Sequence, residues 1–152
     1  MNIKQLHGIH SAAYLLLEKN GKFLMMRRYN TGFYDGLYCF AVGKVDGGEA
    51  CSASVIREAA EELGILIKSE DVECVHITHR LNALPGYTHQ EWFDVFFKAR
   101  AWQGEIINKE PHKCDDISWF DLDALPENII PYLKKAIEHI RKGRFYSEHG
   151  WK

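Results

Sequence analysis

Residues 43–65, with the sequence GKVDGGEACSASVIREAAEELGI, decide which fold the chain is expected to adopt. A glycine-studded loop over 43–49 comes first, and its glycines allow the backbone to approach a metal ion or a phosphate closely. A helix is predicted from about 52 to 63, and Gly64 is expected to end it. An apolar stripe through which the helix can pack on a sheet consists of Val55, Ala59 and Leu63.

Three carboxylates share nearly one face of this helix. Glu58, Glu61 and Glu62 lie at positions i, i+3 and i+4, where like charges cost about a few tenths of a kcal/mol per pair. They also lie in the C-terminal half of the helix, where the helix dipole disfavours anions. Mg²⁺ would make the clustered charges favourable, because it binds carboxylate oxygens. It also retains water molecules at positions that substrate phosphates can take. The alternative is a solvated acidic face with one intrahelical Arg–Glu pair.

A basic residue and a further acid accompany the cluster. Arg57 lies four residues before Glu61 and next to Glu58, so its guanidinium can fix a carboxylate by two charge-assisted hydrogen bonds. Glu49 stands at the end of the loop and can reach back to the cluster. The stretch thus combines a pliable loop, an acidic helix face and one cation that can orient it.

The rest of the chain supplies a sheet and a second helix. A hairpin turn is predicted at 19–21, and a C-terminal helix is predicted to begin at Pro131. Strands are predicted over residues 11–18, 22–28, 72–79, 91–99 and 117–120. Strands interrupted by two helices indicate an α/β (α+β) fold, in which helices cover the faces of a mixed sheet.

Residues 43–65 resemble the Nudix box, G-x5-E-x7-R-E-U-x-E-E-x-G-U, where U is an aliphatic residue. The matching positions are Gly43, Glu49, Arg57, Glu58, Glu61, Glu62, Gly64 and Ile65, with Ala59 as a small occupant of the first U. The resemblance implies an α/β/α sandwich with a mixed, curved sheet between helices. It also implies that residues 1–152 form a single Nudix hydrolase domain. The sequence Phe-Ala-Val stands before Gly43, where many members of the family have Leu-Pro-Gly. The loss of the proline and the glycine bears on substrate preference rather than on catalysis.

The resemblance implies a metal-dependent pyrophosphohydrolase, in which water attacks a nucleoside diphosphate linked to another group X. Its implied metal ligands are Gly43 (through its carbonyl), Glu49, Glu58, Glu61, Glu62 and Glu110, the last from a loop typical of MutT-like proteins. Mg²⁺ is the expected ion and Mn²⁺ the alternative. The implied catalytic residues are Glu58 as the base, Glu61 as the alternative base, and Arg57, which would orient the cluster. Asp115 and Asp116 are the alternatives to Glu110.

Substrate contacts are predicted on the loop before the box. By resemblance, Arg28 and Arg27 are candidates to meet a phosphate or a base, although neighbouring strand residues point to opposite faces and only one can face the cleft. Phe40 and the aromatic residues before it offer surfaces on which a base can stack. His79 and Arg80 are either lining residues of a substrate cleft or a surface pair at the end of a strand.

The expected substrate is a nucleoside triphosphate, oxidised or pyrimidine, cleaved to a monophosphate and pyrophosphate. The resemblance leaves open a nucleotide-sugar or dinucleoside-polyphosphate hydrolase, an isomerase on the same fold, and a non-catalytic module that binds nucleotide or RNA. By resemblance, a Pro or Tyr beyond the box marks the family branches. Leu81, Asn82 and Ala83 occupy that region here, and Pro85 and Tyr87 come slightly later, so neither signature fits cleanly.

The composition of the chain limits the partners that we expect for it. The net charge of −2 provides no broad cationic field for nucleic acid, so we expect a small-molecule nucleotide and no stable nucleic-acid partner. The aliphatic run 12–17 is far shorter than a membrane span. The four cysteines lack a C-x-x-C pair and are expected to be reduced, structural thiols. We therefore expect a cytoplasmic protein, either a monomer or a homodimer.

Overall fold

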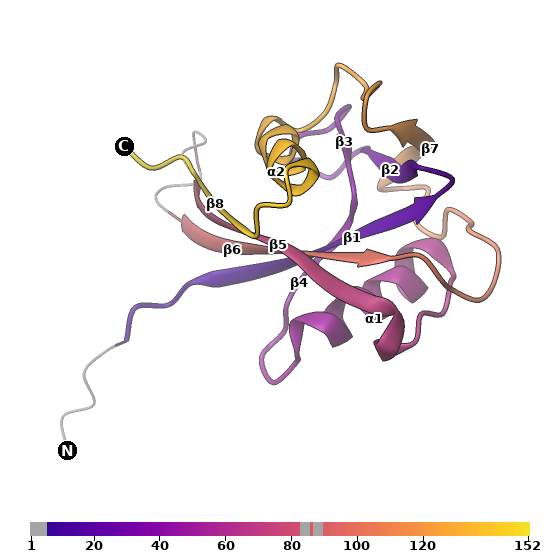
Figure 1. Ribbon diagram of the computed structural model, residues 1–152, viewed down its shortest axis with the longest axis horizontal. Coiled ribbons are helices and arrows are strands. Elements are labelled where there is room, and N and C mark those ends of the chain that lie inside the picture. The colour runs from indigo at the N-terminus through magenta and orange to yellow at the C-terminus, as the bar shows by residue number, and fades with distance from the viewer. Residues whose placement is uncertain (1–5, 83–85, 87–89) are drawn as a thin grey trace.

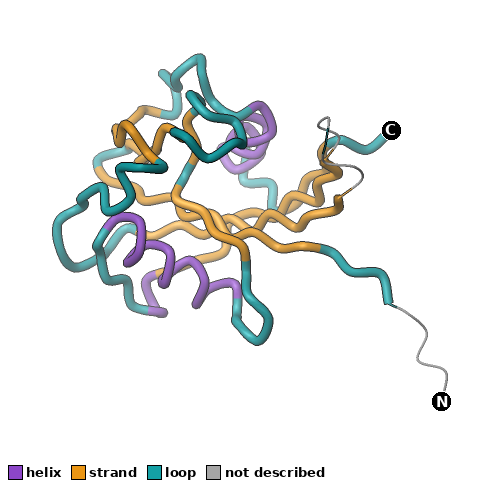
Figure 2. Tube along the Cα trace, turned by 180° about the vertical axis from the view of Figure 1, so that it is seen from behind, coloured by secondary structure: helices purple, strands orange, loops and turns teal. Residues whose placement is uncertain are grey.

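The structure is a computed structural model that describes residues 6–82, 86 and 90–152. A curved sheet lies between two helices, with α1 on one face and α2 on the other (Figure 1; Figure 2 gives the reverse view). The elements are β1 His10–Lys19, β2 Lys22–Arg28, β3 Tyr38–Cys39, β4 Ala41–Lys44, α1 Cys51–Leu63, η1 Ser69–Asp71, β5 Val72–Asn82, β6 Gln90–Ala99, β7 Cys114–Asp121, α2 Pro131–Arg141 and β8 Tyr146–His149. This confirms the predicted α/β/α sandwich.

The sheet is mixed, and its order along the main path is β3-β2-β1-β6-β5-β8. The strands β1 and β6 run parallel, as do β5 and β8, whereas β1 pairs antiparallel with both β2 and β4. The strand β7 pairs antiparallel with β2. The box loop therefore leaves the sheet through β4, beside the central strand β1.

Strand β1 is buried on both faces. Its residues 12, 14 and 16 pack in the core beneath α2, whereas residues 13, 15 and 17 pack in the core beneath α1. Successive strand residues point to opposite faces, so an unbroken apolar run is what a strand covered on both sides requires. Each helix contributes its own apolar stripe, with Val55, Ala59 and Leu63 from α1 fully buried.

Helix α1 ends as the sequence predicts. Gly64 has φ 70° and ψ 19°, and its N–H donates to the carbonyl of Ala60. The left-handed conformation favours glycine because it lacks a Cβ. Helix α2 begins at Pro131, where a missing N–H costs no helical hydrogen bond. The predicted hairpin turn also forms, since Asn20 and Gly21 both have positive φ.

The structure differs from the predicted elements at the sheet edges. Strand β8 was not predicted, because Tyr146–His149 carries no alternating apolar pattern and pairs only in tertiary contact with β5. Strand β5 extends to Asn82 rather than ending at His79. Within the described residues, no helix is long and apolar enough to cross a membrane. All four cysteines are free thiols, as expected.

Candidate active site

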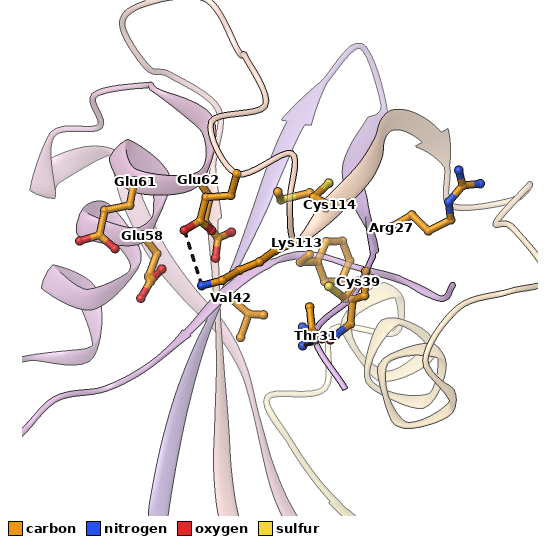
Figure 3. A pocket seen from close by; sticks show the side chains of 13 residues that line it. Arg27, Thr31, Cys39, Val42, Glu58, Glu61, Glu62, Lys113 and Cys114 are labelled. Carbon is orange, nitrogen blue, oxygen red and sulfur yellow. Dashed lines mark hydrogen bonds and ion pairs between the residues drawn. The ribbon is translucent and has the colours of Figure 1, made fainter. Parts of the chain in front are cut away.

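A cavity of about 340 Å³ lies beside the acidic face of α1, and we call it the first cavity. Figure 3 shows the side chains around it, with the glutamates of α1 on one side and the β2 and β7 region on the other. It is lined by Met26, Arg27, Arg28, Thr31, Cys39, Phe40, Val42, Glu58, Glu61, Glu62, Glu110, Lys113 and Cys114. The structure thus brings the three helix glutamates together with Glu110, which lies far along the chain.

Arg57 is the hub of the acidic cluster. Its guanidinium makes two hydrogen bonds to Glu49, from Nε at 2.8 Å and from Nη2 at 3.1 Å. Its Nη1 donates to Glu58 at 2.9 Å and to Glu61 at 3.2 Å. These hydrogen bonds lower the pKa of Glu49 to about 2. The bidentate partner is therefore the loop residue Glu49, and Arg57 fixes the loop and the helix glutamates in one network.

Gly43 is required where the loop meets the helix. A Cβ at this position would overlap the carboxylate of Glu58. The absence of a side chain lets this carboxylate lie directly against the backbone of β4. Because the backbone φ of Gly43 is not positive, the requirement concerns space and not conformation.

Glu62 lies in the least favourable position for a negative charge. Burial raises its pKa well above the ordinary value, and the charges of Glu58 and Glu110 raise it further. Burial likewise raises the pKa of Glu58, while Arg57 opposes the rise. Lys113 reaches toward the cluster from the loop before β7 (Figure 3), and its Nζ lies 3.9 Å from a Glu110 carboxylate oxygen. The cluster holds more negative charge than its protein cations neutralise.

The donor set fits a hard divalent cation. In the described part of the chain, no three His, Cys, Asp or Glu side chains converge on one point. Arg57 instead draws the carboxylates of Glu49, Glu58 and Glu61 to itself. The four glutamates of the first cavity nevertheless offer only hard oxygen donors, and the bare backbone of Gly43 leaves room beside Glu58. The residues present therefore suit Mg²⁺ or Mn²⁺.

The predicted substrate residues separate as the strand geometry requires. Arg28 lies at the cavity, where Nε donates to the carbonyl of Phe33 at 2.6 Å and Nη2 donates to Thr31 at 3.1 Å. Arg27 also lines this cavity, but its guanidinium points away from the glutamates and pairs with Asp115 (Figure 3). Phe40 borders the cavity but is fully buried in the core, so its ring is a wall and not a surface for stacking.

A second cavity, of about 460 Å³, adjoins the first, and both are lined by Arg28, Thr31 and Val42. Its other lining residues are Ala12, Tyr14, Phe33, Gly43, Lys44, Arg80, Asn82, Gln90, Trp92 and Tyr132. Four aromatic rings and three basic side chains thus face this space, and none of the described lining residues is acidic. A polyphosphate near Arg28 can extend from one cavity into the other.

The pair His79–Arg80 is divided between the two faces of the sheet. Arg80 lines the second cavity, so its interpretation as a surface residue is wrong. His79 points the other way and contacts the rings of Phe93 and Trp151. Of the residues in the region that marks family branches, Leu81 and Asn82 end β5, whereas Ala83, Pro85 and Tyr87 lie outside the described residues.

Some site residues were not found from the sequence, and others did not reach the cavities. Asp115 pairs with Arg27, and Asp116 accepts hydrogen bonds from Tyr38 and Ser118, so neither replaces Glu110. Glu49 lines neither cavity and instead holds Arg57. The lining residues that sequence reasoning missed are Thr31, Lys113, Lys44, Trp92 and Tyr132. Nothing in their local sequence distinguishes them from surface or core residues.

Known proteins are similar to this chain over most of its length. An NAD-capped RNA hydrolase NudC of Pseudomonas aeruginosa is 28% identical over 138 residues, which are 88% of this chain and 45% of that protein. The chain thus spans about half the length of this relative. An 8-oxo-dGTP diphosphatase of Buchnera aphidicola is 26% identical over 129 residues, which cover 81% of this chain and 91% of that protein.

A solved structure shares the fold. The crystal structure of a MutT NUDIX hydrolase from Burkholderia pseudomallei superposes with a TM-score of 0.77 at 26% identity, and covers 87% of this chain and 98% of that chain. The profile of the NUDIX domain matches residues 7–140. Because this match covers most of the sequence and includes both the box and the sheet around it, the chain belongs to the NUDIX domain family.

Proposed function

We propose that the protein is a metal-dependent pyrophosphohydrolase that cleaves a nucleoside triphosphate to a monophosphate and pyrophosphate. The observation that carries this proposal is the first cavity, where Glu58, Glu61 and Glu62 face Glu110 from another loop. Nudix relatives named as hydrolases support the reaction class. The excess of carboxylates suits divalent cations that neutralise a diphosphate.

The metal-binding residues follow from the same cavity. Glu58, Glu61, Glu62 and Glu110 would hold Mg²⁺ or Mn²⁺ together with the carbonyl of Gly43, while Glu49 acts through Arg57. A bound metal would neutralise the negative charge on the phosphate oxygens as the two phosphate groups separate.

The side chains of the chain itself perform the remaining work. Glu58 accepts the proton of the attacking water at a carboxylate oxygen, with Glu61 as the alternative base. Arg57 holds both carboxylates in position through Nη1. Arg28 and Lys113 line the same cavity as the glutamates and can bind phosphate oxygens. Charge-assisted contacts of this kind orient the diphosphate in line with the water.

The two adjoining cavities support a substrate with two unlike ends. The acidic first cavity suits a metal-bound diphosphate, and the aromatic, basic second cavity suits a nucleoside. Relatives that act on NAD-capped RNA and on 8-oxo-dGTP differ in the group beyond the diphosphate, so both types of substrate belong in the test.

The test is hydrolysis of a nucleotide panel in H₂¹⁸O with Mg²⁺, followed by location of the label in the products. The panel contains the common and oxidised nucleoside triphosphates, a nucleotide sugar, a dinucleoside polyphosphate and NAD-capped RNA. We expect label in the monophosphate or the pyrophosphate of a triphosphate substrate. Turnover of the nucleotide sugar or the capped RNA alone would replace the proposed substrate class, and absence of turnover on the whole panel would refute the proposal.

A further inference from the structure

A buried ion pair that the proposed reaction does not use lies beside the second cavity, whose lining includes the arginine of the pair, Arg80. Helix α2 contacts β5 on one face of the sheet (Figure 1). Arg80 on β5 and Asp94 on β6 lie on this face, because Arg80 contacts Tyr132 of α2 and donates to Asp94. Their side chains are only 6% and 0% exposed. Taking two such charges out of water costs several kcal/mol per ion before their attraction is counted. A pair that serves folding alone could be replaced by apolar side chains at little cost.

Arg80 is held rigidly by its neighbours. Its Nε donates to Asp94 Oδ2 at 2.5 Å, and its Nη2 donates to Oδ1 at 3.0 Å. Its guanidinium lies 4.2 Å from the ring centroid of Tyr132 and 5.6 Å from that of Trp92. A guanidinium that is stacked and bonded along one edge has a single orientation, so little entropy is lost when it binds a ligand.

The opposite edge of this guanidinium faces the cavity. Nη1 makes no hydrogen bond to any described residue, yet it is not among the buried polar atoms that lack a partner. Because Arg80 lines the second cavity, the small exposed part of its side chain opens into that space. Nη1 and the outer N–H of Nη2 therefore form a fork of two donors without a partner among the described residues.

The chemistry of this fork selects its ligand. Two parallel N–H donors match two neighbouring acceptors in a plane, which the O6 and N7 atoms of guanine or hypoxanthine provide. Adenine presents an N6 amino donor beside N7. Because a guanidinium has only donors, this amino group finds no acceptor on an arginine. Among the described lining residues, the amides of Asn82 and Gln90 could accept from such an amino group, so an adenine site would use them and not Arg80. The buried rings of Trp92 and Tyr132 form walls of the same cavity beside Arg80.

We propose that the second cavity binds a 6-oxopurine base and that Arg80, positioned by Asp94, reads its O6/N7 edge. The inference rests on the proposed function, because it assigns the nucleoside end of the same substrate. It replaces the oxidised or pyrimidine nucleotide expected from the sequence with guanosine and inosine nucleotides. Arg80 is a specificity residue here, since it lies in the second cavity and not among the glutamates of the first.

The experiment compares two ligands that differ only at this edge. Inosine and adenosine triphosphates have the same phosphates and sugar, and their monophosphates can be tested for binding without hydrolysis. We expect kcat/KM for ITP to exceed that for ATP by about 5- to 150-fold, the range for one bidentate base contact. Calorimetry in EDTA should show the same preference for IMP over AMP. Equal values for the two ligands would overturn the inference.

Three variants locate the effect. Arg80→Lys keeps the charge and the ion pair but loses the fork, so the ITP/ATP ratio should fall toward one, mainly through KM for ITP. Arg80→Met with Asp94→Leu removes both charges without leaving either unpaired and should give the same loss. Arg100→Lys is the matched control, because Arg100 is exposed and pairs with Glu18 outside both cavities. Its ratio should equal that of the parent.

The outcomes separate this inference from the proposed function. If Arg80→Lys slows ITP and ATP equally, Arg80 serves a phosphate or the fold, and the base assignment is wrong. Arg80-dependent preference for IMP in a protein that hydrolyses no nucleotide would uphold the base site and refute the proposed reaction. Equal hydrolysis of ITP and ATP would uphold the proposed reaction and refute the base site.

Discussion

Glu62→Gln tests whether the acidic face of α1 is a site or a surface, and its effect on stability depends on pH. In the metal-free protein, burial and the charges of Glu58 and Glu110 raise the pKa of Glu62 above that of the unfolded chain. A carboxyl group with a raised folded pKa favours folding when protonated, and this contribution is lost as the pH rises through the folded pKa. The glutamine side chain of the variant cannot ionise, so the variant keeps its stability.

The magnitude follows from proton linkage. The unfolding free energy of the variant minus that of the parent should grow by about 1.4 kcal/mol per pH unit, from about pH 4.3, the unfolded value for Glu, to the folded pKa. It should then become constant. From helix spacing alone, we expect only about a few tenths of a kcal/mol. The difference arises because Glu62 is partly buried beside Glu110, which comes from a different part of the chain.

The assay is urea unfolding in EDTA at several pH values between about 4 and 8, the range that spans the ordinary and the raised pKa of a carboxyl group, repeated with saturating Mg²⁺. Ligand binding stabilises the folded state, so Mg²⁺ should stabilise the parent more than the variant. The kcat/KM of the variant should fall on the order of a hundredfold, because a metal ligand is lost. Glu138→Gln is the control, because the Glu138 side chain on α2 is exposed, and it should change stability by less than about 0.5 kcal/mol. A flat difference across this pH range, with activity retained, would refute the assignment of Glu62.

Three further predictions address the same machinery. Excess EDTA should abolish turnover, and activity should rise toward alkaline pH because a base must lose its proton; full turnover in EDTA would contradict the metal requirement. Arg28→Ala should raise KM with little change in kcat, since a remote phosphate contact binds ground and transition states alike, and steady-state kinetics on the best substrate would show this. Gly43→Ala should lower kcat/KM at least tenfold, because its Cβ overlaps the Glu58 carboxylate, whereas Gly47→Ala, where a Cβ meets nothing, is the control; equal activity of the two variants would show that Glu58 can lie elsewhere.

Local sequence was enough to predict the main elements of the fold. The hairpin at Asn20–Gly21, the end of α1 at Gly64 and the start of α2 at Pro131 each depend on the backbone preference of one or two residues. The box glutamates were predictable for a similar reason, since helical spacing alone places them on one face. Strand β8 escaped prediction, because its pairing with β5 depends on a partner distant in sequence.

The sequence by itself determined the acidic helix face, the glycine that approaches it and the family to which both belong. Only the tertiary structure decided how the residues around this face meet, including Glu49 and Glu110, which the resemblance had implied. Arg57 pairs with Glu49 across eight residues, Glu110 reaches the cluster from the loop before β7, and Arg80 lies beneath α2 beside Asp94. The physical reason is that the charge and burial at these positions arise from contacts between elements. Residue spacing within one element does not predict such contacts.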